Sequence, residues 1–472
     1  MAAPLQCHAG DADLISNLPS ELLSAIISRL ATTEAACTAV LSTRWRDAWR
    51  GTPLRLVDLE LPAAPHPSVA RAASAAGTPW AASADTISLA LASHGGPVAR
   101  FRLARTTLRA RVPAAEAWFR DLAADRRARE VFLVCPPEWC HLALADPLLA
   151  SPTLETLALG ECRFSDAGAA AASAFRLTEL SLSRTHISEA ALQSLLSGCP
   201  ALRSVVLRHI QGPGRIRISS CRSLVLLGVW QYKHLEELTV EDAPRLECLL
   251  GDVDLRAAVT IIRAPKLTAL GYLVVGFRDF FHRIDTPAAQ EKISKGLHAP
   301  FNNVKILSIS ASFSSKKNIE MAINLLKCFP LLETLHIQDK QAEDNVDTVD
   351  SNYYQKLDPI GCIVNHLKSA RLETKVESQR STAEMRNVLK FLCFLLANAQ
   401  VLQIMKIQFA ISDTPAWIVE HENLLSQCCY RASAEAKVVF EDLKVSQRKG
   451  FSIEAVNALP DPFNGDIDIM GY

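Results

Sequence analysis

Few residues in this sequence have the type and spacing that chemistry would require. Cys135, Cys140 and His141 could each bind zinc, but three neighbouring ligands lack the second pair that a tetrahedral zinc site uses. His421 is followed by Glu422 but not by a histidine four residues on, so the zinc-protease motif is absent. There is also no phosphate-binding loop, no GxGxxG fingerprint and no GxSxG motif. We therefore predict a protein without catalytic residues, metal or cofactor, which acts by binding.

The charge balance narrows the classes of partner. The 472 residues include 50 lysines and arginines against 50 acidic residues, so the formal net charge is zero. Residues 100–129 are locally basic, with nine arginines and three acids, and could contact phosphates, but a solvated helix and loop face is the preferred interpretation. No uninterrupted apolar stretch reaches about 18 residues, the length that a membrane span needs. We expect neither a nucleic-acid partner nor a membrane.

The cysteines and the first residues indicate a compartment. Thirteen cysteines are scattered from Cys7 to Cys429 without a CxxC pair, a pattern that favours reduced, mostly buried thiols over a disulfide framework. The opening residues MAAPLQCHAGDADL lack the basic patch and apolar run of a signal peptide. We therefore expect the protein in the cytoplasm, the nucleus or both.

Residues 13–51 predict three short helices. One stripe of a helix with 3.6 residues per turn is formed by the apolar residues Leu18, Leu22, Leu23, Ile26, Ile27 and Leu30. Residues 31–34 predict a break, after which a threonine can cap a second helix with Glu34 near its positive end. Ser42 or Thr43 can cap a third helix, which carries two tryptophans and ends near Gly51. So small a core is marginal alone and needs a partner.

The same segment resembles the F-box of plant F-box proteins with leucine-rich repeats. The match covers LPSELLSAIISRL and VLSTRWRDAW, with Ala31 where the family usually has proline. An ordinary amphipathic helix packing within its own domain is the alternative. The resemblance implies docking to a Skp-type adaptor and, through it, to the cullin of a ubiquitin ligase. It implies adaptor contacts at Leu18, Pro19, Leu22, Ile26, Leu30, Val40, Leu41 and Trp45.

From residue 98 onward an apolar-x-x-apolar-x-apolar motif recurs, with starts 22–30 residues apart up to residue 224 and less regular spacing after it. The motif starts at Val98, Ala128, Leu154, Leu177, Leu202, Leu224, Leu235, Leu246, Leu267, Val304, Leu332, Leu367 and Leu402. Motif and period are those of leucine-rich repeats. The last two apolar residues alternate along a short strand and point inward, where the neighbouring repeats cover them. A set of unrelated buried strands is the alternative.

We predict an α+β or α/β solenoid, with a small three-helix F-box followed by an irregular leucine-rich-repeat horseshoe. The starts at Leu224, Leu235 and Leu246 are only about 11 residues apart, too close for a helix between them, so we expect strand and loop there. The predicted divisions are an F-box at 11–53, a linker and first connecting segment at 54–97, repeats at 98–360, an FBD-like capping region at 361–440 and a loose tail at 441–472.

The FBD-like region is a second resemblance. Residues 366–440, including STAEMRNVLKFLCFLLANAQVLQIMKI and RASAEAKVVF, look like the FBD region that closes many plant F-box and repeat proteins. Its pattern predicts an amphipathic helix flanked by strands, which could cover the open end of a solenoid. We prefer this capping role to a separate binding role.

A target surface is predicted on the repeat strands. Residues that alternate with the inward pair face outward. They include Arg102, Arg208, Trp230, Glu241, His336, Gln338 and Lys406. Arginine and tryptophan are favoured interface anchors. The alternative is that these side chains only cover the sheet.

Two functions fit the sequence. The first is the substrate-recognition subunit of an SCF-type (Skp-cullin-F-box) ubiquitin ligase, whose F-box docks the adaptor and whose repeats hold an unknown protein target. The second is a leucine-rich-repeat scaffold or regulatory binding protein that causes no degradation. The distribution of lysine bears on the first function: no lysine precedes Lys233.

Overall fold

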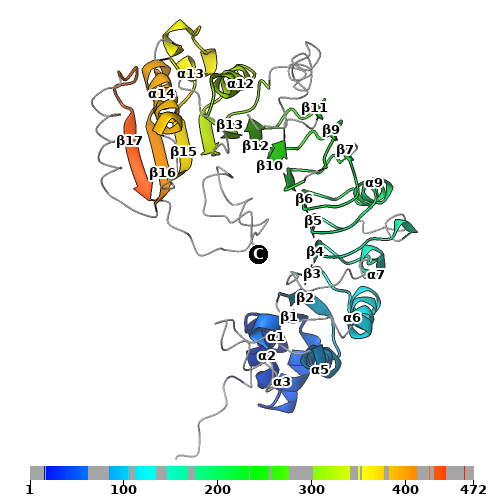
Figure 1. Ribbon diagram of the computed structural model, residues 1–472. Helices are drawn as coiled ribbons and strands as arrows, with labels where there is room; N and C mark the ends of the chain where they lie inside the picture. Colours follow the sequence, from blue (N-terminus) through cyan, green and yellow to red (C-terminus); the bar gives the residue numbers. More distant parts are fainter. Residues whose placement is uncertain are drawn as a thin grey trace, which may run out of the picture. The chain divides into compact units, whose positions relative to one another are not determined.

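The structure is a computed structural model, in which the chain divides into two compact units, residues 1–199 and 200–472 (Figure 1). The described residues are 15, 18–61, 84–104, 106, 112–133, 146–167, 176–219, 221–232, 234–254, 258–275, 301–340, 349–350, 353–376, 382–411, 425, 430–442 and 462. Among the described helices, none combines the length and the apolarity that crossing a bilayer would take. The two units are treated separately below.

Unit 1 begins with the three predicted helices, α1 (Ser20–Ile27), α2 (Thr32–Thr38) and α3 (Thr43–Gly51). The hydroxyl of Ser42 caps α3, because its Oγ accepts from the backbone N of Trp45 at 3.2 Å. The expected threonine cap of α2 is wrong, since Ala31 occupies the capping position and Glu34 Oε2 instead accepts from the backbone N of Ala31 at 3.3 Å. The core of this bundle is small and consists of Leu23, Ile27, Ala35, Trp45 and Trp49.

A parallel sheet follows the bundle directly. Its strands lie in chain order as β1 (Leu54–Val57), β2 (Val98–Leu103), β3 (Glu130–Leu133), β4 (Thr156–Gly160) and β5 (Glu179–Ser183). The connecting segments hold η1 (Asp58–Glu60), α5 (Ala84–His94), α6 (Val112–Ala124), α7 (Asp146–Leu149) and α9 (Glu189–Gly198). The repeat sheet therefore starts at Leu54 rather than at Val98, and the segment predicted as a linker contributes its first strand.

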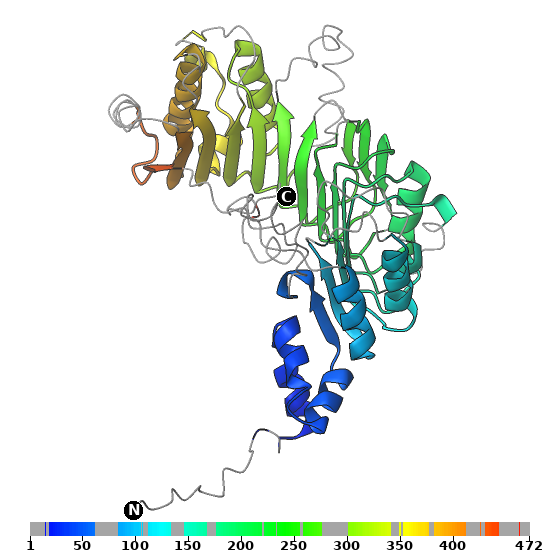
Figure 2. The same ribbon diagram turned by 60° about the horizontal axis from the view of Figure 1, so that its bottom comes forward.

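The apolar pattern explains how these elements pack. In β2 the alternate residues Phe101 and Leu103 are fully buried, as the motif predicts. Phe101 meets Phe119 of α6 edge-on, with ring centroids 6.4 Å apart. The helices thus cover one face of the sheet, and Figure 2 shows them along that face.

Unit 2 contains a longer parallel sheet. Its strands lie in the order β6 (Ser204–Arg208), β8 (Leu226–Trp230), β10 (Cys248–Asp254), β12 (Ala269–Val275), β13 (Ile306–Ala311), β14 (Thr334–Asp339), β15 (Ser369–Val376), β16 (Ile404–Ile411) and β17 (Lys437–Asp442). The helical segments are α12 (Lys316–Leu326), η3 (Tyr354–Lys356), α13 (Gly361–Asn365) and α14 (Thr382–Asn398). The FBD-like region thus continues the repeat sheet through β15, β16 and β17, with α14 between strands as its pattern predicts.

The closely spaced motifs contain strand and loop in the described residues, as expected, but their strands are divided between two sheets. Three strands, β7 (Arg215–Ile218), β9 (Glu237–Val240) and β11 (Ala258–Ile261), form a separate sheet in the order β11-β9-β7. The motif at Leu235 belongs to β9 in this second sheet, whereas those at Leu224 and Leu246 precede β8 and β10. The main repeat therefore keeps a period of about 22 residues here, and strands replace the helices on the return path.

The predicted fold class is confirmed as a mixed α/β structure with N-terminal F-box helices and a large parallel repeat sheet. Cys393 of α14 is disulfide-bonded, which the cysteine pattern did not predict. Among the cysteines that the structure describes, seven have free thiols, and four of the seven are buried: the free thiols are those of Cys37, Cys162, Cys199, Cys221, Cys248, Cys328 and Cys362. The zinc-ligand candidates of the sequence, residues 135, 140 and 141, lie outside the described residues.

Candidate functional site

The first candidate surface lies on α1. Leu22 is 50% exposed and Ile26 is exposed one helical turn further on, so the two side chains share one face of the helix. The stripe predicted from the sequence is therefore divided, because Leu23 and Ile27 fill the core while Leu22 and Ile26 face outward. Pro19 is exposed as well.

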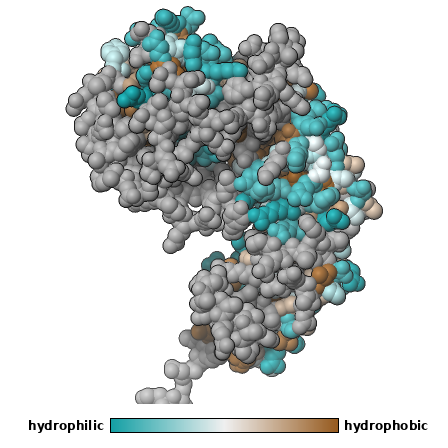
Figure 3. Space-filling model, viewed as in Figure 1, coloured by the Kyte–Doolittle hydropathy of each residue, from teal (hydrophilic) through white to brown (hydrophobic). Residues whose placement is uncertain are grey.

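A second apolar group follows α2. Val40 is 80% exposed in the turn between α2 and α3, and Leu41 beside it is also largely exposed. Ile15 is a third exposed apolar residue that the sequence prediction missed, although its place three residues before Leu18 is a helix-like spacing. Brown patches in the lower part of Figure 3 show hydrophobic residues at this surface. Large exposed apolar residues gathered on a small unit are typical of protein interaction sites.

Three predicted adaptor contacts lie deeper than expected. Trp45 is only 4% exposed and belongs to the core of the bundle, so it supports the surface from beneath rather than contacting a partner directly. Leu18 and Leu30 are half-buried and pack against the same core. The residues that a partner can reach are Pro19, Leu22, Ile26, Val40 and Leu41.

The F-box helices are joined to the repeat sheet by buried polar groups, of which His94 at the end of α5 is one. Its Nδ1 accepts from the backbone N of Gly96 at 3.1 Å, which places the ring proton on Nε2. Nε2 then donates to the backbone carbonyls of Trp49 and Thr52, each at 2.9 Å. The imidazole also meets the Trp49 ring edge-on at 4.8 Å between centroids. Burial lowers the pKa of His94, and the nearby Arg126 charge acts in the same direction.

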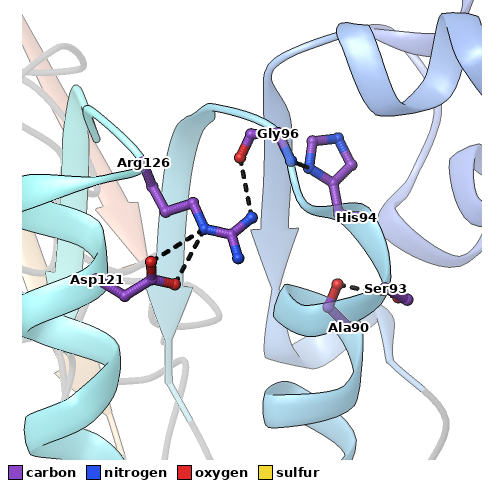
Figure 4. A network of polar contacts seen from close by, with 6 residues as sticks. All are labelled: Ala90, Ser93, His94, Gly96, Asp121 and Arg126. Carbon is purple, nitrogen blue, oxygen red and sulfur yellow. Dashed lines mark hydrogen bonds and ion pairs between the residues drawn. The ribbon is translucent and has the colours of Figure 1, made fainter.

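Figure 4 shows how this contact continues to α6. The Gly96 carbonyl accepts from Arg126 Nη1 at 3.1 Å, and Arg126 Nε pairs with the Asp121 carboxylate, with the nearer oxygen at 3.0 Å. Gly96 also lies against α3, because a Cβ at this position would come within 2.2 Å of the Arg50 carbonyl oxygen. The end of α3 is therefore held by a chain of contacts that reaches the second repeat.

Thr32 makes another connection, from α2 to β1. Its Oγ1 donates to the Arg55 carbonyl at 2.8 Å or to Glu60 Oε2 at 2.7 Å, and accepts from the backbone N of Val57 at 3.1 Å. The Glu60 carboxylate also accepts from the Thr32 backbone N at 2.6 Å, next to the positive end of α2. The start of α2 is thus stabilised from outside the F-box motif.

Asp58 makes a third connection. This side chain is 1% exposed, and its carboxylate accepts from the backbone N of Ala104 at 2.9 Å and from both the backbone N and Oγ1 of Thr106 at 2.9 Å. A buried carboxylate needs such donors, and these come from the segment after β2. None of the three connections was predicted, because each joins residues at least 23 positions apart.

The second candidate surface is the face of the repeat strands opposite the helices. Arg208 is half-buried and donates to Gln231 Oε1 at 3.4 Å, Gln338 accepts from Ser310 Oγ at 3.3 Å, and Lys406 pairs with Glu441 at 3.2 Å. His336 is buried. These positions lie on the main sheet, as predicted, but their side chains are already partly occupied or covered.

Two predicted target residues are placed differently by the structure. Trp230 is only 3% exposed, and its ring lies over Gly228 of the same strand, where a Cβ would come within 2.1 Å of Cζ3. Trp230 packs with Val206, Leu226, Leu250 and Ala269 in an apolar cluster. Glu241 directly follows β9 of the second sheet and pairs with Arg217 at 3.6 Å, so it is not on the predicted face. The predicted exposure of Trp230 is therefore wrong, as is the predicted position of Glu241 on the main sheet, while contact of either residue with a target stays a prediction.

The second sheet itself carries a polar surface. Arg215 pairs with Glu237 at 3.8 Å, and Asp242 lies between Arg222 at 3.6 Å and Arg263 at 3.8 Å. Hydrophilic residues gather in Figure 3 over the part of the molecule where β7 and β9 lie. Exposed pairs of this kind contribute little to stability and keep the sheet solvated.

Comparison with known proteins gives two family matches. The F-box domain family matches residues 15–56, and the family described as FBD-associated F-box protein At5g56370, LRR repeats, matches residues 115–337. The small helical bundle corresponds to the F-box, and the stacked parallel strands correspond to the leucine-rich repeats. The chain is therefore an F-box protein with leucine-rich repeats. Within that class, the chain is similar to F-box/FBD/LRR-repeat proteins of plants.

The relatives are from Arabidopsis thaliana. The F-box/FBD/LRR-repeat protein At5g22660 is 50% identical over 48 residues, which is 10% of this chain and 11% of the relative. F-box protein At5g03100 is 28% identical over 46% of this chain and 64% of its own length. Putative F-box/LRR-repeat protein At3g18150 is 26% identical over 68% of this chain and 62% of its own length. The chain therefore spans less than two-thirds of the length of these relatives.

Proposed function

We propose that this chain is the substrate-recognition subunit of an SCF-type ubiquitin ligase, acting in the cytoplasm or nucleus. The exposed apolar residues Leu22 and Ile26 of the F-box carry the proposal, because they form a ready docking stripe for a Skp-type adaptor. The adaptor would join the chain to a cullin, and the repeats would hold a protein target. The chain would supply position rather than catalysis, since holding two reactants together raises their effective concentration.

The docking stripe can be tested by replacing Leu22 and Ile26 together with aspartate. The two charges would be buried without partners in an apolar interface, so we expect a loss of several kcal/mol of binding energy, or about a hundredfold or more in Kd. Binding to a purified Skp-type adaptor is the measurement. Leu89→Asp is the matched control, because Leu89 is 70% exposed on α5 and outside the stripe. Full adaptor binding by the folded double variant would refute the assignment.

A scaffold that binds partners without causing their degradation is the second candidate, and the same variant separates the two. In cells, a substrate receptor that has lost its adaptor should leave its target stable, whereas a scaffold should act on its partners as before. We expect the double variant to prolong the half-life of proteins bound by the repeats. Unchanged half-lives in cells where the variant no longer binds the adaptor would favour the scaffold.

A further inference from the structure

Two rows of side chains cross the strands of unit 1 on the face opposite the helices. The strand register places Arg55, Arg100, Glu130, Thr156 and Glu179 in the first row. It places Val57, Arg102, Phe132, Ala158 and Ser181 in the second row. The first row is balanced, with two arginines and two glutamates, whereas the second contains one arginine and no acid. The two rows together therefore carry a single excess positive charge.

The charges of the first row are already engaged. Arg100 Nε forms an ion pair with Glu130 of the adjacent strand. Arg55 Nη1 donates to the Ser28 carbonyl at 3.3 Å, and Glu179 Oε2 accepts from Thr156 Oγ1 at 3.4 Å. These contacts hold the side chains of the row within the sheet surface, so they offer little unpaired charge to a partner.

Arg102 differs from these residues. Its Nε is buried, and no acceptor for it exists among the residues that the structure describes. Its guanidinium lies 5.8 Å from the ring centroid of Phe132, and the Arg100 guanidinium lies 5.5 Å from the same centroid. The ring therefore holds the Arg102 head in place without neutralising it. Other bases on repeat strands have acidic partners, as with Arg371 and Glu373 at 3.2 Å or Lys406 and Glu441 at 3.2 Å.

Arg102 as a whole is partly exposed, so an anion can approach its guanidinium even though the Nε is buried. A planar guanidinium matches a carboxylate in a bidentate pair, and charge-assisted hydrogen bonds are about twice as strong as neutral ones. Phe132 is half-buried and presents apolar surface beside the charge. Val57, Ala158 and Ser181 in the same row are partly exposed and introduce no competing charge. Such a pairing of arginine with an aromatic residue is typical of energetically dominant interface positions.

We propose that Arg102 and Phe132 anchor the protein target by a single aspartate or glutamate side chain with an apolar group next to it. This inference rests on the proposed function, because it assigns the chemistry of the target that the repeats hold. One excess positive charge matches one carboxylate. A phosphate dianion would bring more negative charge than this surface can neutralise.

The test uses the full chain copurified with a Skp-type adaptor and a display library of random unphosphorylated peptides. Peptides selected on the wild-type complex should be enriched in aspartate or glutamate beside apolar residues. Arg102→Gln should weaken their binding by about tenfold or more, and Arg102→Lys should restore part of it because charge without the planar fork remains. Changing the critical acid of the peptide to its amide should cost little further affinity in the Arg102→Gln protein, since the two changes remove the same contact.

Arg120→Gln is the control variant, because Arg120 is exposed on α6, outside the strand face, and its Nε donates to the Glu116 carbonyl at 3.3 Å. It should leave peptide binding unchanged. Selection without enrichment of acidic residues, equal binding to the Arg102→Gln complex, or binding that requires a phosphopeptide would each overturn the inference. The adaptor is retained in the same sample, so adaptor binding is intact there. A failure of peptide binding would then count against the Arg102 surface and not against the proposed function.

Discussion

At the scale of single residues, His94 connects pH to the stability of unit 1. Burial lowers the pKa of His94 in the folded chain, below the value of about 6.5 expected when the chain is unfolded. Between these two values the unfolded chain binds more protons, so the free energy of unfolding rises with pH across that window. Above about pH 6.5 both states are neutral, and His94 adds no further pH dependence.

We therefore expect the wild-type protein to lose stability between about pH 7.5 and about pH 5.5 by more than a His94→Phe variant does. The variant keeps a ring of similar shape but cannot donate to the carbonyls of Trp49 and Thr52, so it should be less stable at both pH values by about 1–3 kcal/mol. Urea unfolding followed by circular dichroism measures both quantities. Equal losses on acidification in the two proteins would contradict the role given to His94.

Gly96 and Gly51 offer a matched pair for the packing of α3 against the first repeat. A methyl group at Gly96 would meet the Arg50 carbonyl oxygen at 2.2 Å, whereas one at Gly51 meets nothing within 4 Å. Because backbone would have to move, Gly96→Ala should cost about 1–3 kcal/mol or more. Gly51→Ala, at the end of α3, should be neutral or slightly stabilising. Thermal unfolding compares them, and equal midpoints for the two variants would show that α3 and the turn at Gly96 do not pack as described.

At the scale of elements, the sequence pattern predicted what local periodicity determines. The three F-box helices and most repeat strands follow from the spacing of apolar residues, because each buries one stripe or one alternating face. β1 was missed since Leu54 and Leu56 form too short a pattern to recognise without their partner strand β2. The second sheet was missed because the motif at Leu235 has the same pattern as a repeat strand. Which sheet a strand joins depends on tertiary contacts that periodicity does not contain.

For the candidate surfaces too, the sequence predicted the local position of a residue but not its tertiary contacts. Leu22 and Ile26 were correctly placed on α1, but spacing alone could not show that Leu23 and Ile27 fill the core while their neighbours face outward. Trp230 was expected outside because it alternates with inward residues, yet the absence of a side chain at Gly228 lets its ring fold onto the strand. Arg102 was expected on the strand face, but the sequence could not show that no described acid pairs with it, because that depends on the register of five strands.

At the scale of the whole molecule, the distribution of lysine has a consequence for a ubiquitin ligase. No lysine precedes Lys233, so unit 1, residues 1–199, has only arginine and histidine as basic side chains. A codon bias toward arginine is the simple explanation, but the consequence holds either way. Ubiquitin is normally transferred to a lysine amine, for which the always protonated guanidinium does not substitute. Under the proposed function, self-modification on lysine side chains would be confined to Lys233 and later residues.

This can be measured by assembling the ligase with the wild-type chain and mapping the modified sites by mass spectrometry. We expect every modified side chain to be a lysine at or beyond residue 233. Introducing one lysine in unit 1, at exposed Arg120 of α6, should create a new modified site if that region lies within reach of the charged ubiquitin carrier. A wild-type chain modified only at its N-terminal amine would show that lysine placement does not govern the reaction.

The connection made by Asp58 also bears on the order in which the protein folds as it is synthesised. The F-box helices leave the ribosome before the repeat strands, and the donors that satisfy the Asp58 carboxylate lie 46 and 48 residues after it, at Ala104 and Thr106. At about 5–20 residues per second, these residues follow after roughly 2–10 s. During that interval β1 has no partner strand and the carboxylate must remain in water. The adaptor-binding helices therefore reach their final support only when the second strand of the repeat sheet has been made.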